Sequence, residues 1–101
     1  METIITISGS CIFYVERCMI KDLSGTTRCL TPLEFGVMKF LTENENSVLT
    51  KDHIIEKVWG YDALDQGLAN VIAKLRRDFP ALKRAIKTVR GIGYALILKS
   101  F

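Results

Sequence analysis

The sequence predicts an α+β fold, with short strands at both ends of the chain and helices between them. Three observations support this prediction. The first thirty residues are rich in β-branched and aromatic side chains and are interrupted by short turns. The middle of the chain has apolar residues at helical spacing behind clear helix caps. Near the C-terminus, two apolar runs flank a glycine-rich turn, which is typical of a β-hairpin.

Residues 3–30 are expected to form a four-stranded antiparallel sheet. Only two or three residues separate the apolar segments, and connections this short join antiparallel neighbours. The expected strands are Ile4–Ile7, Cys11–Val15, Cys18–Asp22 and Thr26–Leu30.

The first helix has a strong start signal in the sequence LTPLEF. Thr31 is placed to cap the helix, and Pro32 takes the first helical position, where its missing N–H costs nothing. Glu34 can close a capping box with Thr31. We therefore expect a helix over residues 32–43.

Two further helices are predicted after it. Thr50 can cap a helix over residues 51–59, which Gly60 ends. The third helix is expected to start at about Asp65 and to cover residues 66–79, because a proline directly follows.

The third helix has two different faces. Its buried stripe is expected to contain Leu68, Val71, Ile72, Leu75 and Phe79. The opposite face combines small, amide and cationic side chains, namely Gln66, Ala69, Asn70, Ala73, Lys74 and Arg77, with Arg76 on its flank. Small residues allow a close backbone approach, and amide and cationic tips can reach base edges and phosphates in a major groove. An ordinary amphipathic surface helix is the alternative interpretation.

The C-terminal hairpin is expected over residues 85–98. Gly91 and Gly93 allow the positive φ angles of a tight turn, which leaves Arg90 projecting from its tip. A narrow minor groove attracts an inserted arginine. By itself, Arg90 could also serve only solubility.

Charge is unevenly distributed along the 101 residues. Residues 1–66 contain 6 Lys/Arg and 10 Asp/Glu, whereas residues 67–101 contain 8 Lys/Arg and a single acid. A basic third on a neutral-to-acidic body is typical of a polyanion-binding face. The apolar runs are too short to cross a bilayer, and the N-terminus does not resemble a signal peptide. We expect this domain in the cytoplasm.

The sequence offers no pattern for catalysis or metal binding. Cys11, Cys18 and Cys29 form no CxxC pair, and the single His53 is distant from them. We expect reduced, mostly packed thiols, with a Cys11–Cys18 bridge as the minor alternative, and a surface position for His53. No nucleophile–base arrangement or phosphate-binding loop is present, so an enzyme is the poorest fit and no cofactor is expected.

Four motifs in order resemble the winged helix-turn-helix domain of OmpR/PhoB-type transcriptional regulators: LTPLEF, LTKDHIIEKVWG, NVIAKLRRDF and IKTVRGIGYAL. The resemblance implies one domain over residues 1–101, with an N-terminal four-stranded antiparallel sheet, three helices and a C-terminal hairpin wing. It also implies that residues 51–59 form the positioning helix and residues 66–79 the recognition helix. The loop Gly60–Gln66 would contact RNA polymerase, as in the family, and dimers would form on repeated half-sites.

The resemblance also assigns individual positions. It implies that Asn70, Lys74 and Arg77 face the major groove, that Thr88 contacts a phosphate and that Arg90 enters the minor groove. Arg76 matches the arginine of the family's I-x-x-L-R pattern, and it would bridge backbone phosphates or pair with an internal acid such as Glu34.

The chain also departs from the family pattern. Response regulators often carry a charged run where this chain has Ala69 and Ala73, which reduces the number of side chains that could read bases. Met1 directly precedes the first strand. This order favours the ToxR/CadC-like branch, in which the DNA-binding domain begins the polypeptide and a membrane segment follows, over a response regulator with a preceding receiver domain.

The leading hypothesis is sequence-specific binding of double-stranded DNA in transcriptional regulation. Asn70 would read bases, and phosphate contacts would come from Lys74, Arg77, Lys83, Arg84 and Thr88. The alternative is a winged-helix protein-interaction module that docks or sequesters another regulator without binding DNA itself.

Overall fold

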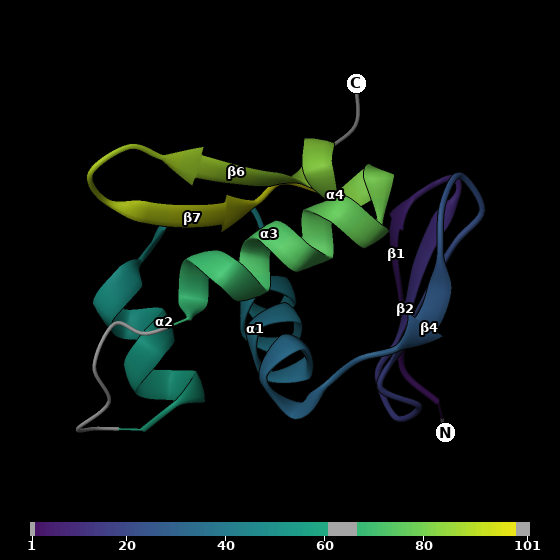
Figure 1. The fold of residues 1–101 in the computed structure, drawn as a ribbon, viewed down its shortest axis with the longest axis horizontal. Coiled ribbons are helices and arrows are strands. Elements are labelled where there is room, and N and C mark those ends of the chain that lie inside the picture. The colour runs from purple at the N-terminus through teal and green to yellow at the C-terminus, as the bar shows by residue number, and fades with distance from the viewer. Residues whose placement is uncertain (1, 61–66, 99–101) are drawn as a thin grey trace.

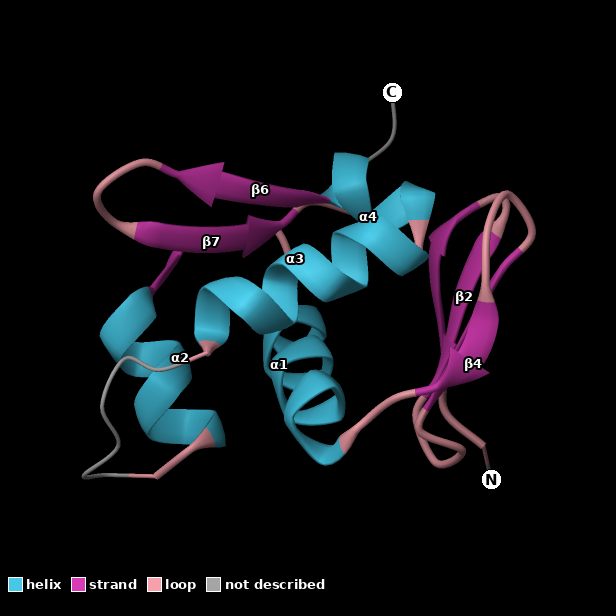
Figure 2. Cartoon of the chain, viewed as in Figure 1, coloured by secondary structure: helices cyan, strands magenta, loops and turns pink. Residues whose placement is uncertain are grey.

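A computed structural model describes residues 2–60 and 67–98, and Figure 1 shows its α+β architecture. The N-terminal strands are β1 (Ile4–Ser8), β2 (Cys11–Tyr14), β3 (Met19–Asp22) and β4 (Thr27–Cys29). They form an antiparallel sheet in the order β1-β2-β3-β4. This is the predicted four-stranded sheet, and it lies at one end of the molecule beside the helices (Figures 1 and 2).

The first two helices begin and end at the predicted signals. Helix α1 covers Pro32–Glu43, and the Thr31 side chain and Glu34 form the predicted capping box. Helix α2 covers Lys51–Val58, with the Thr50 side chain accepting a hydrogen bond from a backbone N–H in its first turn. Gly60, just beyond α2, has a φ of 119°, which a residue with a side chain rarely adopts.

Helix α3 covers Leu68–Asp78 and starts later than the sequence predicted. Gly67 precedes it with a φ of 106° and makes no side-chain cap. The predicted start at about Asp65 and the residue Gln66 lie outside the described residues. Pro80 ends α3 as expected, but it also begins a short helix that the sequence reasoning missed, α4 (Pro80–Ala85).

Helix α4 depends on a distant side chain for its start. Its N-cap residue Phe79 makes no side-chain cap hydrogen bond. The buried carboxylate of Asp22, on β3, accepts a hydrogen bond of 3.0 Å from the Ala81 N–H instead. Sequence periodicity cannot reveal a cap that arrives from 59 residues away.

The hairpin joins a second, three-stranded sheet. Strands β6 (Ile86–Val89) and β7 (Gly93–Leu96) pair antiparallel as predicted, and β7 also pairs with the two-residue β5 (Leu49–Thr50), which was not predicted. Gly91 has a φ of 76°, as expected for the turn, whereas Gly93 does not have a positive φ. Gly93 is required for another reason, because a Cβ there would lie 1.9 Å from the carbonyl oxygen of Leu49.

The core draws on both sheets and on all four helices. The expected stripe of α3 is buried at Leu68, Ile72 and Leu75, and Val71 is only half-buried. Within residues 2–60 and 67–98, none of the helices has the length and apolar character needed to span a bilayer.

Candidate nucleic-acid interface

The outer face of α3 presents most of the side chains that the sequence singled out. The exposed residues of this face are Ala69, Asn70, Ala73, Lys74 and Arg77, and they lie opposite the buried stripe. Gln66 lies outside the described residues. Because three of the five carry a polar or charged tip and two are alanines, a polyanion can approach the helix closely and still meet hydrogen-bond donors.

Arg76 connects α3 to the hairpin. Its Nη2 donates to the carbonyl oxygen of Ile86 at 2.7 Å and to the hydroxyl of Thr88 at 2.9 Å. Its guanidinium carbon lies 5.8 Å from the centre of the Tyr94 ring, on β7. Of the two roles expected for Arg76, the pairing with Glu34 is therefore wrong, because Arg76 turns toward β6, and the bridge to backbone phosphates stays a prediction. The Arg76 Nε is buried and has no partner among the described residues.

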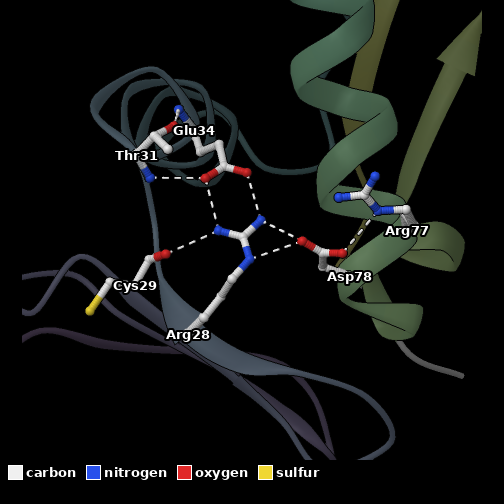
Figure 3. A network of polar contacts seen from close by, with 6 residues as sticks. All are labelled: Arg28, Cys29, Thr31, Glu34, Arg77 and Asp78. Atoms are coloured by element: carbon white, nitrogen blue, oxygen red, sulfur yellow. Dashed lines mark hydrogen bonds and ion pairs between the residues drawn. The ribbon is translucent and has the colours of Figure 1, made fainter.

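Glu34 instead pairs with Arg28, on β4, in a network that sequence reasoning missed (Figure 3). Arg28 Nη1 and Nη2 donate to the two oxygens of Glu34 at 2.9 and 2.7 Å, and Nη1 also donates to the Cys29 carbonyl oxygen at 3.0 Å. Arg28 Nε donates to Asp78 Oδ2 at 2.9 Å. A single guanidinium thus joins the N-terminal sheet to the start of α1 and the end of α3.

The network shifts the pKa values of its acids. Burial would raise the pKa of Glu34, but hydrogen bonds from Arg28 and from the Thr31 N–H outweigh it, and the pKa lies below its usual value. The pKa of Asp78 is also lowered, first by the hydrogen bond from Arg77 and then by Arg28. Both acids are therefore charged at neutral pH.

Arg77 and Lys83 lie at the same hollow, between the end of α3 and the start of α4. It is lined by Ala73, Arg76, Arg77, Pro80 and Lys83. Arg84 lies elsewhere, since it lines a hollow beside β1 with residues such as Thr6 and Leu98. Helix α4 thus divides the two cations that the sequence had grouped together.

Arg90 is exposed at the tip of the β6–β7 hairpin. Next to it, Ile92 exposes 51% of its surface, so the turn carries a cation and an apolar side chain together. Thr88 is exposed on β6, and its hydroxyl accepts the hydrogen bond from Arg76. The Arg76 contact therefore ties the position of the hairpin to the position of α3.

The cysteines are unpaired among the described residues, so the alternative of a Cys11–Cys18 bridge is wrong for this structure. Burial, with a smaller contribution from Asp22, raises the pKa of Cys11 to about 12, so this thiol stays protonated. Cys29 is exposed, against the expectation of packing. His53 is exposed as predicted, and its ring lies edge-on to Phe40 at 5.2 Å. In residues 2–60 and 67–98, no three His, Cys, Asp or Glu side chains gather as a metal site.

Residues 25–96 match the family described as "Transcriptional regulatory protein, C terminal". The chain belongs to this family. The domain is of the OmpR/PhoB winged helix-turn-helix type that the four motifs predicted, and its function class is DNA binding in transcriptional regulation. The hairpin is the wing of this fold, whereas the positioning role of α2 and the recognition role of α3 stay predictions.

Curated relatives agree with the family. The chain is 35% identical over 95 residues to the sensory transduction protein RegX3 of Mycobacterium tuberculosis, covering 88% of this chain and 41% of RegX3. It is 44% identical over 71 residues to the response regulator MprA of a Mycobacterium species, covering 66% of this chain and 31% of MprA. The chain thus spans less than half the length of these regulators.

Solved structures share the fold. The RstA DNA-binding domain of Klebsiella pneumoniae, solved in complex with the RstA box, matches this chain with a TM-score of 0.72 at 24% identity. The match covers 96% of this chain and 99% of the RstA chain. The DNA-binding domain of E. coli CadC also has a TM-score of 0.72, at 22% identity, covering 95% of this chain and 92% of its own. The two likenesses are equal in TM-score, and the ToxR/CadC branch stays a prediction.

Proposed function

We propose that this winged helix domain binds double-stranded DNA with α3 in the major groove and the tip of the wing in an adjacent minor groove. The observation that supports this proposal is the Arg76 tie between α3 and β6. Because it connects the two elements, the exposed face of α3 and the exposed Arg90 meet a duplex as one unit.

Base reading is assigned to Asn70, whose amide can make a bidentate contact to adenine. Phosphate contacts are assigned to Lys74 and Arg77 on α3, to Lys83 on α4 and to Thr88 on the wing. Ala69 and Ala73 permit the close approach of the backbone. Arg84 lines the hollow beside β1, so we propose it only as a peripheral contact. Gln66 remains a predicted contact.

Arg90 is assigned to the minor groove, where narrow A·T-rich segments concentrate negative potential. Its exposed position on a tight glycine turn suits insertion, because the turn itself is narrow. Ile92 would then lie against the sugars, where removing its exposed apolar surface from water is favourable.

The proposal also covers the extent of the domain, its location and its partners. We propose that residues 1–101 form one domain, as the hydrophobic core shared by the two described segments suggests, and that this domain acts in the cytoplasm. Contact with RNA polymerase through the loop Gly60–Gln66 and dimerisation on repeated half-sites remain predictions from the family resemblance.

Selection of bound sequences from a random duplex pool tests the proposal directly. We expect enrichment of a short motif, and affinity that falls steeply with salt because phosphate contacts release counterions. Asn70→Ala should lose about 1–3 kcal/mol of discrimination at one base pair. Arg90→Ala should weaken binding and reduce the slope of log affinity against log salt.

The matched control is Arg17→Ala, which removes an exposed arginine from the turn between β2 and β3, where no DNA contact is proposed. Unchanged binding by both Asn70→Ala and Arg90→Ala would refute the site assignment. Absence of any salt-dependent DNA binding by the natural sequence would favour the protein-interaction alternative.

A further inference from the structure

The side chain of Arg77 is held by its neighbour, although it is largely exposed. Its Nε donates to Asp78 Oδ1 at 3.0 Å, while 71% of the arginine side chain is accessible to solvent. Within the described residues, its two terminal amines have no hydrogen-bond partner. Figure 3 shows the Nε of Arg77 facing the carboxylate.

Asp78 can hold Arg77 because Asp78 is itself fixed from the other side. Its Oδ2 lies 2.9 Å from Arg28 Nε and 2.8 Å from Arg28 Nη2, and only 19% of its side chain is exposed. Arg28 is anchored in turn by the two-pronged contact with Glu34, whose side chain is 2% exposed. Asp78 Oδ2 therefore accepts from the largely buried Arg28, and Asp78 Oδ1 accepts from the exposed Arg77.

We propose that Asp78 is a positioning residue for DNA binding, which orients the Arg77 guanidinium so that its terminal amines meet a backbone phosphate. This inference rests on the proposed function. The Arg77 Nε–H donates to Asp78, so the two terminal amines of Arg77 remain for a phosphate. A phosphate is well matched by a planar donor with two N–H groups. Holding the side chain beforehand removes part of the ordering cost that a free surface arginine meets on binding.

The proposal and simple electrostatics predict opposite changes in DNA affinity when the Asp78 charge is removed. Removing a negative charge beside a DNA-binding face should tighten binding, because it removes repulsion from the phosphates. If Asp78 positions Arg77, Asp78→Asn should instead weaken binding. We expect the affinity for DNA to fall by about twofold to tenfold, which is the factor associated with ordering one long side chain.

A double-mutant cycle separates this role from a merely structural one. Affinity for a labelled random-sequence duplex is measured for the natural sequence, Asp78→Asn, Arg77→Ala and the double variant, at two salt concentrations. The expected result is that Asp78→Asn weakens binding when Arg77 is present and has no weakening effect when position 77 is alanine. The single and the double variant that carry Asp78→Asn lose the same Arg28 contact, so the effect on the fold cancels in this comparison.

Three outcomes overturn the proposal. They are tighter or equal binding by Asp78→Asn, an equal loss in both backgrounds, and wild-type affinity for Arg77→Lys, which keeps the charge but has no Nε–H. The last variant keeps Asp78, so it tests the proposal even if Asp78→Asn fails to fold. If the natural sequence binds no DNA, the proposed function fails first, and that result is distinct from all three.

Discussion

Arg28→Met should lower the free energy of unfolding substantially although it changes the shape of the side chain little. Methionine keeps the length and apolar stem of arginine but supplies none of its five N–H donors. It leaves Glu34, with a side chain 2% exposed, without its two-pronged partner. Among the described residues, the donor that remains for this carboxylate is the Thr31 backbone N–H, at 2.9 Å.

The expected cost follows from burial. Removing one partner of a buried ion pair destabilises a protein by about 3–5 kcal/mol. Water screens part of this interaction, since 22% of the Arg28 side chain and 19% of the Asp78 side chain are exposed. We therefore expect the lower end, about 3 kcal/mol, which lowers the Tm of a domain of this size by about 12–24 °C.

The assay is thermal and urea unfolding followed by circular dichroism, with Arg17→Met as the matched control. Arg17 Nε lies 2.7 Å from Glu2 Oε1, but 63% of the arginine side chain is exposed. Exposed pairs contribute less than about 1 kcal/mol. A loss in Arg28→Met no larger than that in Arg17→Met would refute the reasoning from burial.

The pH dependence provides an independent check. The folded state lowers the pKa of Glu34 and of Asp78, so both acids add stability above their unfolded pKa values and lose it as pH falls through the folded ones. The difference between the natural protein and Arg28→Met should thus be largest near neutral pH and should shrink in acid, as Glu34 becomes protonated. A constant difference across this range would contradict the assignment.

Three further predictions concern other parts of the fold. Gly93→Ala should destabilise the domain by about 1–3 kcal/mol in urea unfolding, because the new Cβ would lie 1.9 Å from a carbonyl oxygen of β5. Gly9→Ala is its control and should be nearly neutral, since nothing lies within 4 Å of its Cβ. Asp22→Ala should cost about 1–3 kcal/mol by removing the buried acceptor of the first α4 amide, and unchanged stability would contradict that role. In alkylation followed by mass spectrometry, Cys29 should react in the native state and Cys11 only after unfolding, because Cys29 is exposed and burial raises the pKa of Cys11 to about 12.

Much of the fold was predictable because its signals are local. The threonine caps at Thr31 and Thr50, the stop at Gly60 and the turn at Gly91 each depend on residues within one helical turn. The exposed face of α3 followed from periodicity in the same way. These features depend on chain geometry over a few residues, which the sequence states directly.

Several of the features that were missed depend on partners far apart in the chain. Helix α4 starts on a carboxylate of β3, and Gly93 is small because β5 passes close to it. On charge alone, the partner of Glu34 could have been Arg76 or Arg28, and the folded chain places Arg28 Nη2 at 2.7 Å from Glu34. That choice left Arg76 for the wing.

By itself, the sequence determined the class of fold, the order of the first three helices and of the strands at both ends, and the basic face of α3, because apolar spacing and net charge need no tertiary knowledge. The tertiary structure alone decided which cation meets which acid. The Arg28–Asp78 contact, for example, depends on the distance between two segments that are 50 residues apart in the chain. The tertiary structure also decided that Lys83 lies beside Arg77, whereas Arg84 lies beside β1. Lys83 and Arg84 point in different directions because they belong to the short helix α4, which was not predicted.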